Sequence, residues 1–296
     1  MAVCPACRLE MKDQVSCIER PFRIFEDDGS VCVYAPVRYG CEVDDWGGRS
    51  NRPCHDCACR PGDFHHAGCD VERCPRCTGQ AISCDCFSAE SSEGSDARTL
   101  FFYAKEAPAY ADRSDSICTP KHLSRFVSQL TPHSAVLDLG CGAGRDSKVL
   151  IDAGFEVTPL DGSPEMADQA EQRIGKRVRW QLFEELDDIE AFDGIWANAS
   201  LLHVPRRGLN LVLGAVYRAL KPSGLLFASF KSGGQEGRDS LGRYYNYLSA
   251  AEVTASLRET GAWDSVDLEE GRGTGYDGTE SGWVVVFARR SSGAPQ

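Results

Sequence analysis

The chain has 296 residues, a net charge of −12 and a hydrophobic content of 42%, enough for about two domains with a sizeable core. No apolar run approaches the roughly 20 residues that span a bilayer, and the start, MAVCPACRLEMK, lacks the apolar segment of a secretory signal, so a cytoplasmic location without membrane contact is expected. An acidic surface repels phosphate backbones, which disfavours broad, non-specific binding of nucleic acids.

The cysteines divide the chain into two parts. Thirteen of the 15 lie at or before Cys86, and only Cys118 and Cys141 follow. In a reducing compartment, cysteines at short spacings are typical of metal ligands or redox groups rather than of disulfides. Because this region has few apolar residues to bury, zinc is expected to stabilise a small cysteine-rich module over residues 1–87.

The densest stretch, CHDCACRPGDFHHAGCDVERCPRCTGQAISCDC (54–86), holds ligand pairs whose spacing suits tetrahedral zinc. Eight ligands in four pairs are sufficient for two ions, bound either sequentially or in a cross-braced arrangement. His65 competes with His66 in this scheme, and Cys59 is a spare thiol that either substitutes for a ligand or stays free. The four pairs are Cys54/Cys57, His66/Cys69, Cys74/Cys77 and Cys84/Cys86.

A further group of ligands precedes this stretch. Cys4 and Cys7 form another zinc knuckle, Cys17 is the expected third ligand, and Cys32 or Cys41 would complete a third site. A structural role is favoured over a catalytic one, because every ligand has a partner and no coordination position is left open. A redox or metal-sensing role is the alternative, since crowded thiols oxidise when zinc leaves.

Residues 88–98, SAESSEGSDAR, have almost nothing to bury and are expected to form a linker. Alternating helix and strand patterns over residues 99–290 predict an α/β domain with a doubly wound, mostly parallel sheet, followed by a disordered tail at 291–296. Helices are predicted at 119–130, from the glycine loop to 153, and at 164–173, 209–220 and 249–260. Strands are predicted at 135–139, 156–160, 178–182, 193–197, 224–230 and 283–289.

The sharpest feature of this domain is VLDLGCGAGRDS (136–147), where a strand runs into three glycines and then into a helix. Such a loop brings backbone close to a ligand at the carboxyl ends of the strands. The dinucleotide pattern G-x-G-x-x-G would need glycine at Arg145, so a pyrophosphate site is only weakly supported. Asp161 closes the next strand, where a carboxylate can accept hydrogen bonds from both ribose hydroxyls, and the combination predicts an adenosine nucleoside.

Together with FDGIWANASLLHVP (192–205) and ALKPSGLLFASF (219–230), these motifs resemble those of class I S-adenosylmethionine-dependent methyltransferases. The resemblance covers roughly residues 100–290 and implies a Rossmann-like, seven-stranded sheet with S-adenosylmethionine as cofactor. Within that class, FYAKEAPAY, GRDS and ASLLHVP are similar to the tellurite-resistance methyltransferase group. Nothing in these motifs specifies the methyl acceptor.

The resemblance assigns cofactor contacts to the glycine loop. Asp138, Gly140 and Gly142 would face the amino acid part of the cofactor, and Gly144 would allow the close approach of the backbone. Arg145 would pair with the cofactor carboxylate, with a surface position on the helix as the alternative.

The next two strands would bind the nucleoside. The resemblance places Asp161 on the ribose, with Ser163 and Met166 beside the adenine. Phe183 and Glu184, which follow the third strand, would cover the adenine edge.

The remaining assigned residues surround the methyl group. Asn198 or Ala199 would lie near the methionine moiety, and Tyr103 and Tyr110 would come from a lid helix whose rings also favour a sulfonium. His203 is the candidate general base for an acceptor that must lose a proton, the alternative being that it orders its loop or packs beside the cofactor.

The expected function is in-line transfer of a methyl group to a small molecule. The first alternative is an RNA or protein methyltransferase whose zinc module recruits the macromolecule, and the second is a cofactor-binding regulator without turnover. The position after the fourth strand reads ANASLL rather than the Asn/Asp-Pro-Pro-Tyr/Phe motif of nucleic-acid amino-methyltransferases, which disfavours base N-methylation.

Overall fold

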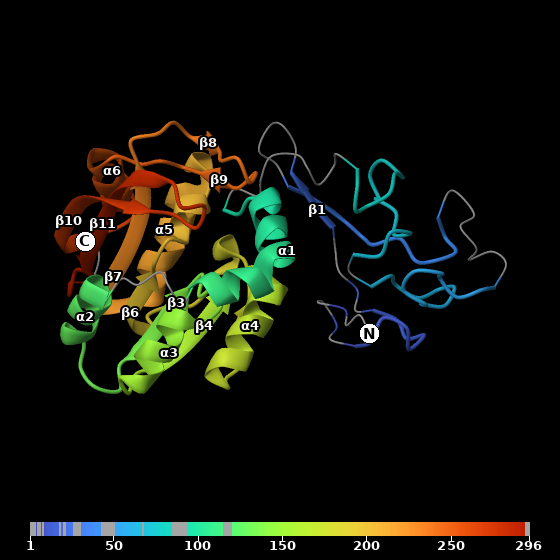
Figure 1. Cartoon of the computed structure of the whole chain (residues 1–296), viewed down its shortest axis with the longest axis horizontal. Helices are drawn as coiled ribbons and strands as arrows, with labels where there is room; N and C mark the ends of the chain where they lie inside the picture. Colours follow the sequence, from blue (N-terminus) through green and yellow to red (C-terminus); the bar gives the residue numbers. More distant parts are fainter. Residues whose placement is uncertain are drawn as a thin grey trace. The chain divides into compact units, whose positions relative to one another are not determined.

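The structure, a computed structural model, describes residues 4, 7, 9–17, 19, 22–25, 31–42, 51–66, 68–84, 94–114 and 120–293. The chain divides into two compact units, Met1–Ser91 and Ser92–Gln296 (Figure 1). Cys86, the predicted partner of Cys84, lies outside the described residues, as does Cys118.

Regular secondary structure is sparse among the described residues of the first unit. Strands β1 (Phe22–Phe25) and β2 (Val31–Tyr34) form an antiparallel pair, and most other described residues lie in turns or irregular segments. The largest buried cluster contains only two residues other than cysteine, so most of its members are thiols. Its members are Tyr39, Cys54, Cys57, Cys59, Cys69 and Val71.

The second unit is built on a seven-stranded sheet. Its strands are β3 (Ala135–Leu139), β4 (Glu156–Asp161), β5 (Arg179–Trp180), β6 (Phe192–Ala197), β7 (Leu220–Ser232), β10 (Trp263–Thr274) and β11 (Glu280–Arg290). The strand order is β10-β11-β7-β6-β3-β4-β5, parallel from β7 to β5 and antiparallel for β10 and β11. This confirms the predicted doubly wound, mostly parallel sheet.

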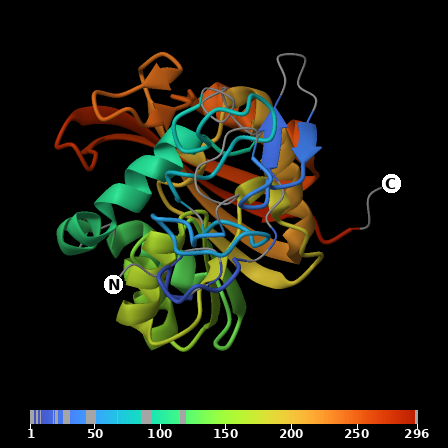
Figure 2. The same ribbon diagram turned by 90° about the vertical axis from the view of Figure 1, so that its right-hand side faces the viewer.

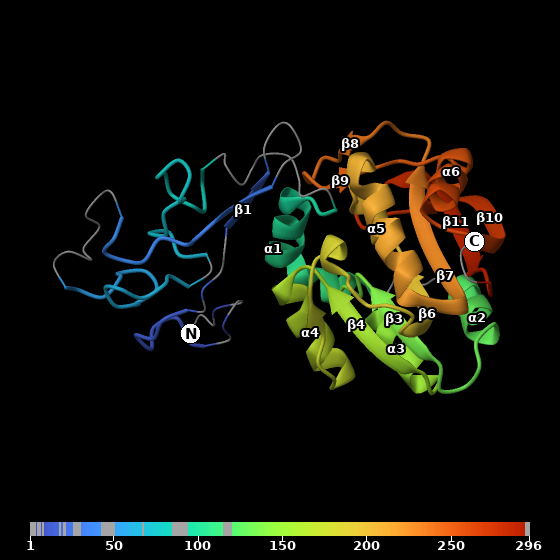
Figure 3. The ribbon, with the colours of Figure 1, turned by 180° about the vertical axis from the view of Figure 1, so that it is seen from behind.

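Helices cover both faces of this sheet, as Figures 1 and 3 show from opposite sides. Leu150 belongs to the same buried cluster as Val136 of β3, and Val212 and Leu257 belong to the cluster of Leu137. Neighbouring residues of a strand point to opposite faces, so α2 and α3 cover one face and α5 and α6 the other. The helices are α1 (Ala97–Ser114), α2 (Pro120–Ser128), α3 (Arg145–Asp152), α4 (Pro164–Ile174), α5 (Arg206–Ala219) and α6 (Ala250–Thr260).

The local sequence explains where the two helices near the glycine loop begin. α3 begins after Gly144, which has φ +78°, a conformation that favours glycine. Ser163 caps α4 by accepting a hydrogen bond from the Met166 amide, and Pro164 occupies the first turn, where proline costs no backbone hydrogen bond. Both helices therefore start at the edge where the parallel strands end.

One predicted strand is too long and another strand was missed. The strand predicted at 178–182 forms only the two-residue β5, and β10 was not predicted. β10 pairs with β11 alone and is the edge of the sheet, so most of its residues face solvent and no apolar run marks it. Salt bridges tie it to α2, from Lys121 to Glu269 at 2.7 Å and from Arg125 to Asp267 at 2.9 Å.

The short elements are η2 (Phe183–Glu185), η3 (Leu201–His203), β8 (Gly237–Arg238) and β9 (Tyr244–Tyr245). η2 and η3 follow the ends of β5 and β6, so they lie at the carboxyl edge of the sheet. Among the helices that the structure describes, none is long and apolar enough to cross a bilayer.

Candidate active site

A cavity of about 860 Å³ lies at the carboxyl edge of the parallel strands. All of its lining residues belong to the second unit. Eleven of the fourteen predicted cofactor residues line it: Tyr103, Tyr110, Asp138, Gly140, Gly142, Arg145, Asp161, Met166, Phe183, Asn198 and Ala199. The other three, Gly144, Ser163 and Glu184, lie outside the lining.

The glycine loop forms one wall of this cavity. Gly140 and Gly142 have φ values of +77° and +56°, so both are in the left-handed region. A Cβ at position 140 would lie 2.4 Å from the Ser200 Cβ, closer than any side chain tolerates. The Ser200 hydroxyl is buried, lines the cavity and has no hydrogen-bond partner among the described residues. A ligand in the cavity would therefore meet bare backbone and an unpaired hydroxyl.

Asp161 ends β4 and lines the cavity beside the loop. Its carboxylate accepts hydrogen bonds from the Gly142 amide at 2.8 Å and the Ser163 amide at 2.9 Å. Burial raises the pKa of Asp161 to about 6, although these amides oppose the shift. Each carboxylate oxygen keeps a second lone pair, which fits the hydroxyls of a ribose.

A polar network beneath the loop holds two further carboxylates. Burial and the neighbouring Asp146 raise the pKa of Asp138 to about 8, and Ser147 donates to it at 2.5 Å. Asp146 accepts from Arg145 Nε at 2.8 Å and from Asn198 Nδ2 at 3.0 Å. Both predicted contact residues, Arg145 and Asn198, are therefore oriented by Asp146. The sequence analysis did not predict this role of Asp146, because its contact with Asn198 joins residues 52 positions apart in the chain.

His203 lies in η3 with both ring nitrogens engaged. Nδ1 contacts the Tyr244 carbonyl at 2.6 Å, and Nε2 contacts the Tyr103 hydroxyl at 2.9 Å. A carbonyl only accepts, so Nδ1 carries the proton and Nε2 accepts from Tyr103. Burial lowers the pKa of His203 to about 3, so the ring is neutral at physiological pH. The pair joins α1 to the end of β6.

Cationic side chains lie beyond this pair. Lys231, at the end of β7, is 3% exposed, and its ammonium lies 4.2 Å from the centre of the Tyr245 ring. Burial lowers the pKa of Lys231. Arg243 is also buried and pairs with Asp239 at 2.7 Å. This end of the cavity thus combines aromatic rings with buried charge.

The tip of the β10–β11 hairpin covers the cavity together with α1, and the two can be followed in Figure 2. Tyr276 stacks on Tyr110 with ring centres 4.9 Å apart, and Arg113 donates to the Tyr276 carbonyl at 3.1 Å. Tyr110 in turn meets Tyr103 edge-on at 5.4 Å. The lid over the cavity therefore consists of the predicted helix and of Tyr276 from the hairpin. The contribution of Tyr276 was not predicted from the sequence, because β10, the first strand of that hairpin, was not predicted.

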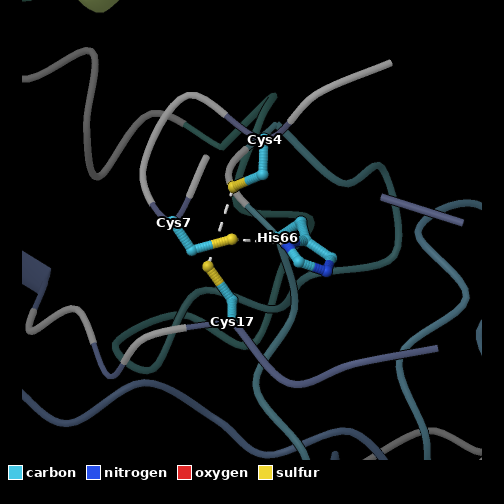
Figure 4. Close-up of side chains that lie close together, drawn as sticks. All are labelled: Cys4, Cys7, Cys17 and His66. Atoms are coloured by element: carbon cyan, nitrogen blue, oxygen red, sulfur yellow. Dashed lines mark hydrogen bonds between the residues drawn. The ribbon is translucent and has the colours of Figure 1, made fainter. Parts of the chain in front are cut away.

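The described cysteines of the first unit gather in three clusters that keep the pairs Cys54/Cys57 and Cys74/Cys77 but divide the histidines differently from the prediction. His66 lies with Cys4, Cys7 and Cys17 rather than with Cys69, and Cys41, a predicted fourth ligand, is exposed (Figure 4). Cys32, the other candidate, lies in β2. The pair His66/Cys69 is therefore wrong, because residue 66 is drawn into a cluster with the N-terminal knuckle.

The other clusters divide the remaining ligands. One contains Cys54, Cys57, Cys59 and His65, with Cys69 in contact. Cys59 is thus a member of a cluster, in agreement with the alternative that it substitutes for a ligand, and His65 does not compete with His66. The last contains Cys74, Cys77 and Cys84. None of the twelve cysteines whose side chains are described forms a disulfide.

Comparison with known proteins agrees with the fold and the cavity. The family model of the methyltransferase domain matches residues 136–224. The ubiquinone biosynthesis O-methyltransferase of Xanthomonas axonopodis pv. citri is 29% identical over 53% of this chain and 73% of its own length. The malonyl-[acyl-carrier protein] O-methyltransferase of Salmonella typhimurium is 34% identical over 42% of this chain, which spans less than half, 47%, of that relative.

A solved structure extends the comparison. Burkholderia thailandensis 1,6-didemethyltoxoflavin-N1-methyltransferase, bound to its substrate and S-adenosylhomocysteine, superposes with a TM-score of 0.54 at 24% identity, over 66% of this chain and 88% of its own. At that identity the likeness shows the fold alone. It is a Rossmann-like methyltransferase fold.

Fold, glycine loop and family model together define the class. The second unit carries a methyltransferase domain with the Rossmann-like fold of S-adenosylmethionine-dependent methyltransferases. The buried carboxylate Asp161, the bare glycine backbone and the unpaired Ser200 hydroxyl fit the hydroxyl and amine groups of this cofactor.

Proposed function

We propose that this protein transfers a methyl group from S-adenosylmethionine to a small-molecule acceptor. The observation that carries the proposal is the cavity, which continues past the glycine loop to His203, Lys231 and Arg243. Its volume of about 860 Å³ lies in the range of small-molecule sites, roughly 300–1,000 Å³. Similar proteins named as methyltransferases of ubiquinone biosynthesis and of 1,6-didemethyltoxoflavin support a small acceptor.

The chain's own residues position the reactants. S-adenosylmethionine supplies an activated methyl group when bound. Asp161 accepts hydrogen bonds from the ribose, and Met166 and Phe183 enclose the adenine. Asp138 and the glycine loop hold the amino acid part. Fixing donor and acceptor in one orientation removes several kcal/mol, about 7–11 in the best cases, from a bimolecular barrier.

We further propose that His203 is a positioning residue rather than a strong base. With a pKa of about 3, it has little tendency to take a proton at neutral pH. By accepting a hydrogen bond from the Tyr103 hydroxyl, His203 leaves a lone pair of the phenol oxygen to accept a hydrogen bond from the methyl acceptor. Tyr103 would then orient the nucleophile.

Replacing His203 with phenylalanine is expected to lower kcat about tenfold and to change the KM for S-adenosylmethionine less than twofold. The loss of one buried hydrogen bond, about 1–1.5 kcal/mol, accounts for that reduction. His203 is expected to contribute no change in kcat between pH 6 and 8, because it does not titrate there. If kcat instead rose with pH through a pKa near 7, and this dependence disappeared in His203→Phe, His203 would be the base.

Affinity for the cofactor is expected to depend on pH through Asp161. The ribose hydroxyls bind the carboxylate form, whose pKa in the free protein is about 6. Affinity is therefore full above about pH 7 and falls as protonation increases through pH 6, by up to tenfold per unit below it. Calorimetry with S-adenosylhomocysteine between pH 5 and 8 measures this. The same slope in Asp161→Asn would assign the titration to another group.

Two other functions are kept as alternatives: methylation of RNA or protein recruited by the first unit, and cofactor binding without turnover. We propose that the first unit is a structural zinc module that presents a surface for recognition or assembly. We also propose kinship with the tellurite-resistance methyltransferases, on the basis of FYAKEAPAY, GRDS and ASLLHVP, and a cytoplasmic location. The linker predicted at 88–98 is too long at its end, because Asp96 is buried and paired with Arg238 and α1 begins at Ala97.

The test is incubation of the purified chain with methyl-labelled S-adenosylmethionine and a native lysate, separated into small molecules, RNA and protein. Label is expected in the small-molecule fraction and absent with Asp161→Ala. Asp152→Ala, on the exposed face of α3, is the matched control. Label in RNA or protein alone would favour the first alternative, and cofactor binding without labelled product would favour the second.

A further inference from the structure

The first unit brings together side chains that are far apart in the chain. Cys4, Cys7, Cys17 and His66 offer four ligand atoms that lie within 4.8 Å of one another. Cys4, Cys17 and His66 are almost completely buried. Figure 4 shows the three sulfurs and the imidazole pointing toward one centre. The cluster therefore has the donors of a closed metal site.

Two distances within the cluster are close to those between ligands of a tetrahedral ion. Cys4 Sγ lies 3.7 Å from Cys17 Sγ, and Cys7 Sγ lies 3.2 Å from His66 Nδ1. Ligands bound to zinc at about 2.3 Å for sulfur and 2.0 Å for nitrogen lie about 3.8 Å apart for two sulfurs and 3.5 Å for sulfur and nitrogen. A disulfide would bring the sulfurs to about 2.05 Å. The spacing thus fits ligands around an ion.

The neighbouring histidine faces a different cluster. His65 Nδ1 lies 3.4 Å from Cys57 Sγ, 3.6 Å from Cys59 Sγ and 3.2 Å from Cys69 Sγ. Its other nitrogen, Nε2, lies 3.1 Å from the buried Glu42 carboxylate. A carboxylate on the far nitrogen is the usual support of a zinc-bound imidazole. Adjacent residues therefore face separate groups of thiols.

We propose that Cys4, Cys7, Cys17 and His66 bind one zinc ion, separate from a second ion held by the thiols around His65. Three thiolates and one imidazole prefer zinc to magnesium or calcium, which take oxygen ligands. The first ion closes a loop from residue 4 to residue 66. The dipeptide His65–His66 then connects the two sites, so the N-terminal knuckle is locked to the centre of the unit.

The test is the zinc content of the full chain, measured by elemental mass spectrometry for single and double variants. Cys7→Ala and His66→Ala are each expected to lose about one zinc relative to the wild type. The double variant is expected to lose about one as well, because both residues serve the same ion. His65→Ala is expected to keep the wild-type content, since Cys54, Cys57, Cys59 and Cys69 remain. His55→Ala, exposed and outside the clusters, is the matched control.

Losses that add to two in the double variant would place Cys7 and His66 on different ions and overturn the proposal. A His66→Ala protein with wild-type zinc content would also overturn it. If the alanine variants lose all zinc through unfolding, His66→Cys decides. This variant keeps four ligands, and with cobalt in place of zinc its absorption is expected to shift as one nitrogen ligand becomes sulfur. An unchanged cobalt spectrum would contradict the assignment.

Discussion

Replacing Asp161 with alanine is expected to reduce the affinity for S-adenosylmethionine at least 100-fold. The carboxylate ends β4 inside the cavity and is the predicted acceptor for both ribose hydroxyls. Hydrogen bonds to a charged group contribute about 1.5–3 kcal/mol each, and a tenfold change in affinity corresponds to about 1.4 kcal/mol. Two such bonds therefore account for the expected loss, which calorimetry with S-adenosylhomocysteine measures.

The control for this experiment must distinguish the loss of the ribose hydrogen bonds from a distortion of the glycine loop. Both can follow the substitution, because Asp161 also accepts hydrogen bonds from the Gly142 and Ser163 amides. Asp161→Asn keeps one carbonyl oxygen and is expected to give an intermediate affinity. Asp152→Ala is expected to bind as the wild type does. An Asp161→Ala protein with unchanged affinity would refute the placement of the cofactor, whereas a general loss of thermal stability would point to collapse of the loop.

Removal of zinc is expected to unfold the first unit and leave the second one folded. The described part of the first unit buries thiols in place of hydrocarbon, so its folding free energy must come from metal binding. Structural zinc contributes about 10–16 kcal/mol in zinc-finger peptides, more than a small core supplies. After treatment with a strong chelator, protease is expected to digest residues 1–91 and spare residues 92–296.

Binding of S-adenosylhomocysteine provides the internal control in the same sample. Its affinity is expected to change less than twofold on chelation, because the whole cavity is lined by the second unit. A first unit that stays resistant to protease without metal would contradict the structural role of zinc. A parallel collapse of cofactor affinity would show that the two units fold together.

The sequence predicted the part of the site that depends on short-range patterns. The positions of Gly140 and Asp161 follow from a strand that ends in glycines and from the next strand's terminal carboxylate. Parallel strands bring their carboxyl ends together at one edge, so residues at those ends are neighbours whatever the loops do. This is why most of the predicted cofactor residues line one cavity.

Contacts between distant segments were not predictable in the same way. The stacking of Tyr276 on Tyr110 depends on a hairpin whose first strand has no apolar pattern. The division of His65 and His66 between clusters was equally hidden, because spacing fixes which ligands form a knuckle but not which knuckles share an ion. Both arrangements are decided by how the chain turns between the motifs.

The two edges of the sheet have a consequence for the behaviour of the protein at high concentration. An unpaired edge strand is a template for aggregation through intermolecular hydrogen bonds. One edge here is β5, only two residues long, and the other is β10, which carries Asp264, Asp267, Glu269 and Glu270. Asp267 and Glu269 are paired with Arg125 and Lys121 of α2, so a second copy approaching β10 would meet a charged edge rather than an apolar one. The sheet is therefore closed to growth by strand addition, and fibrils seeded from its edges are disfavoured.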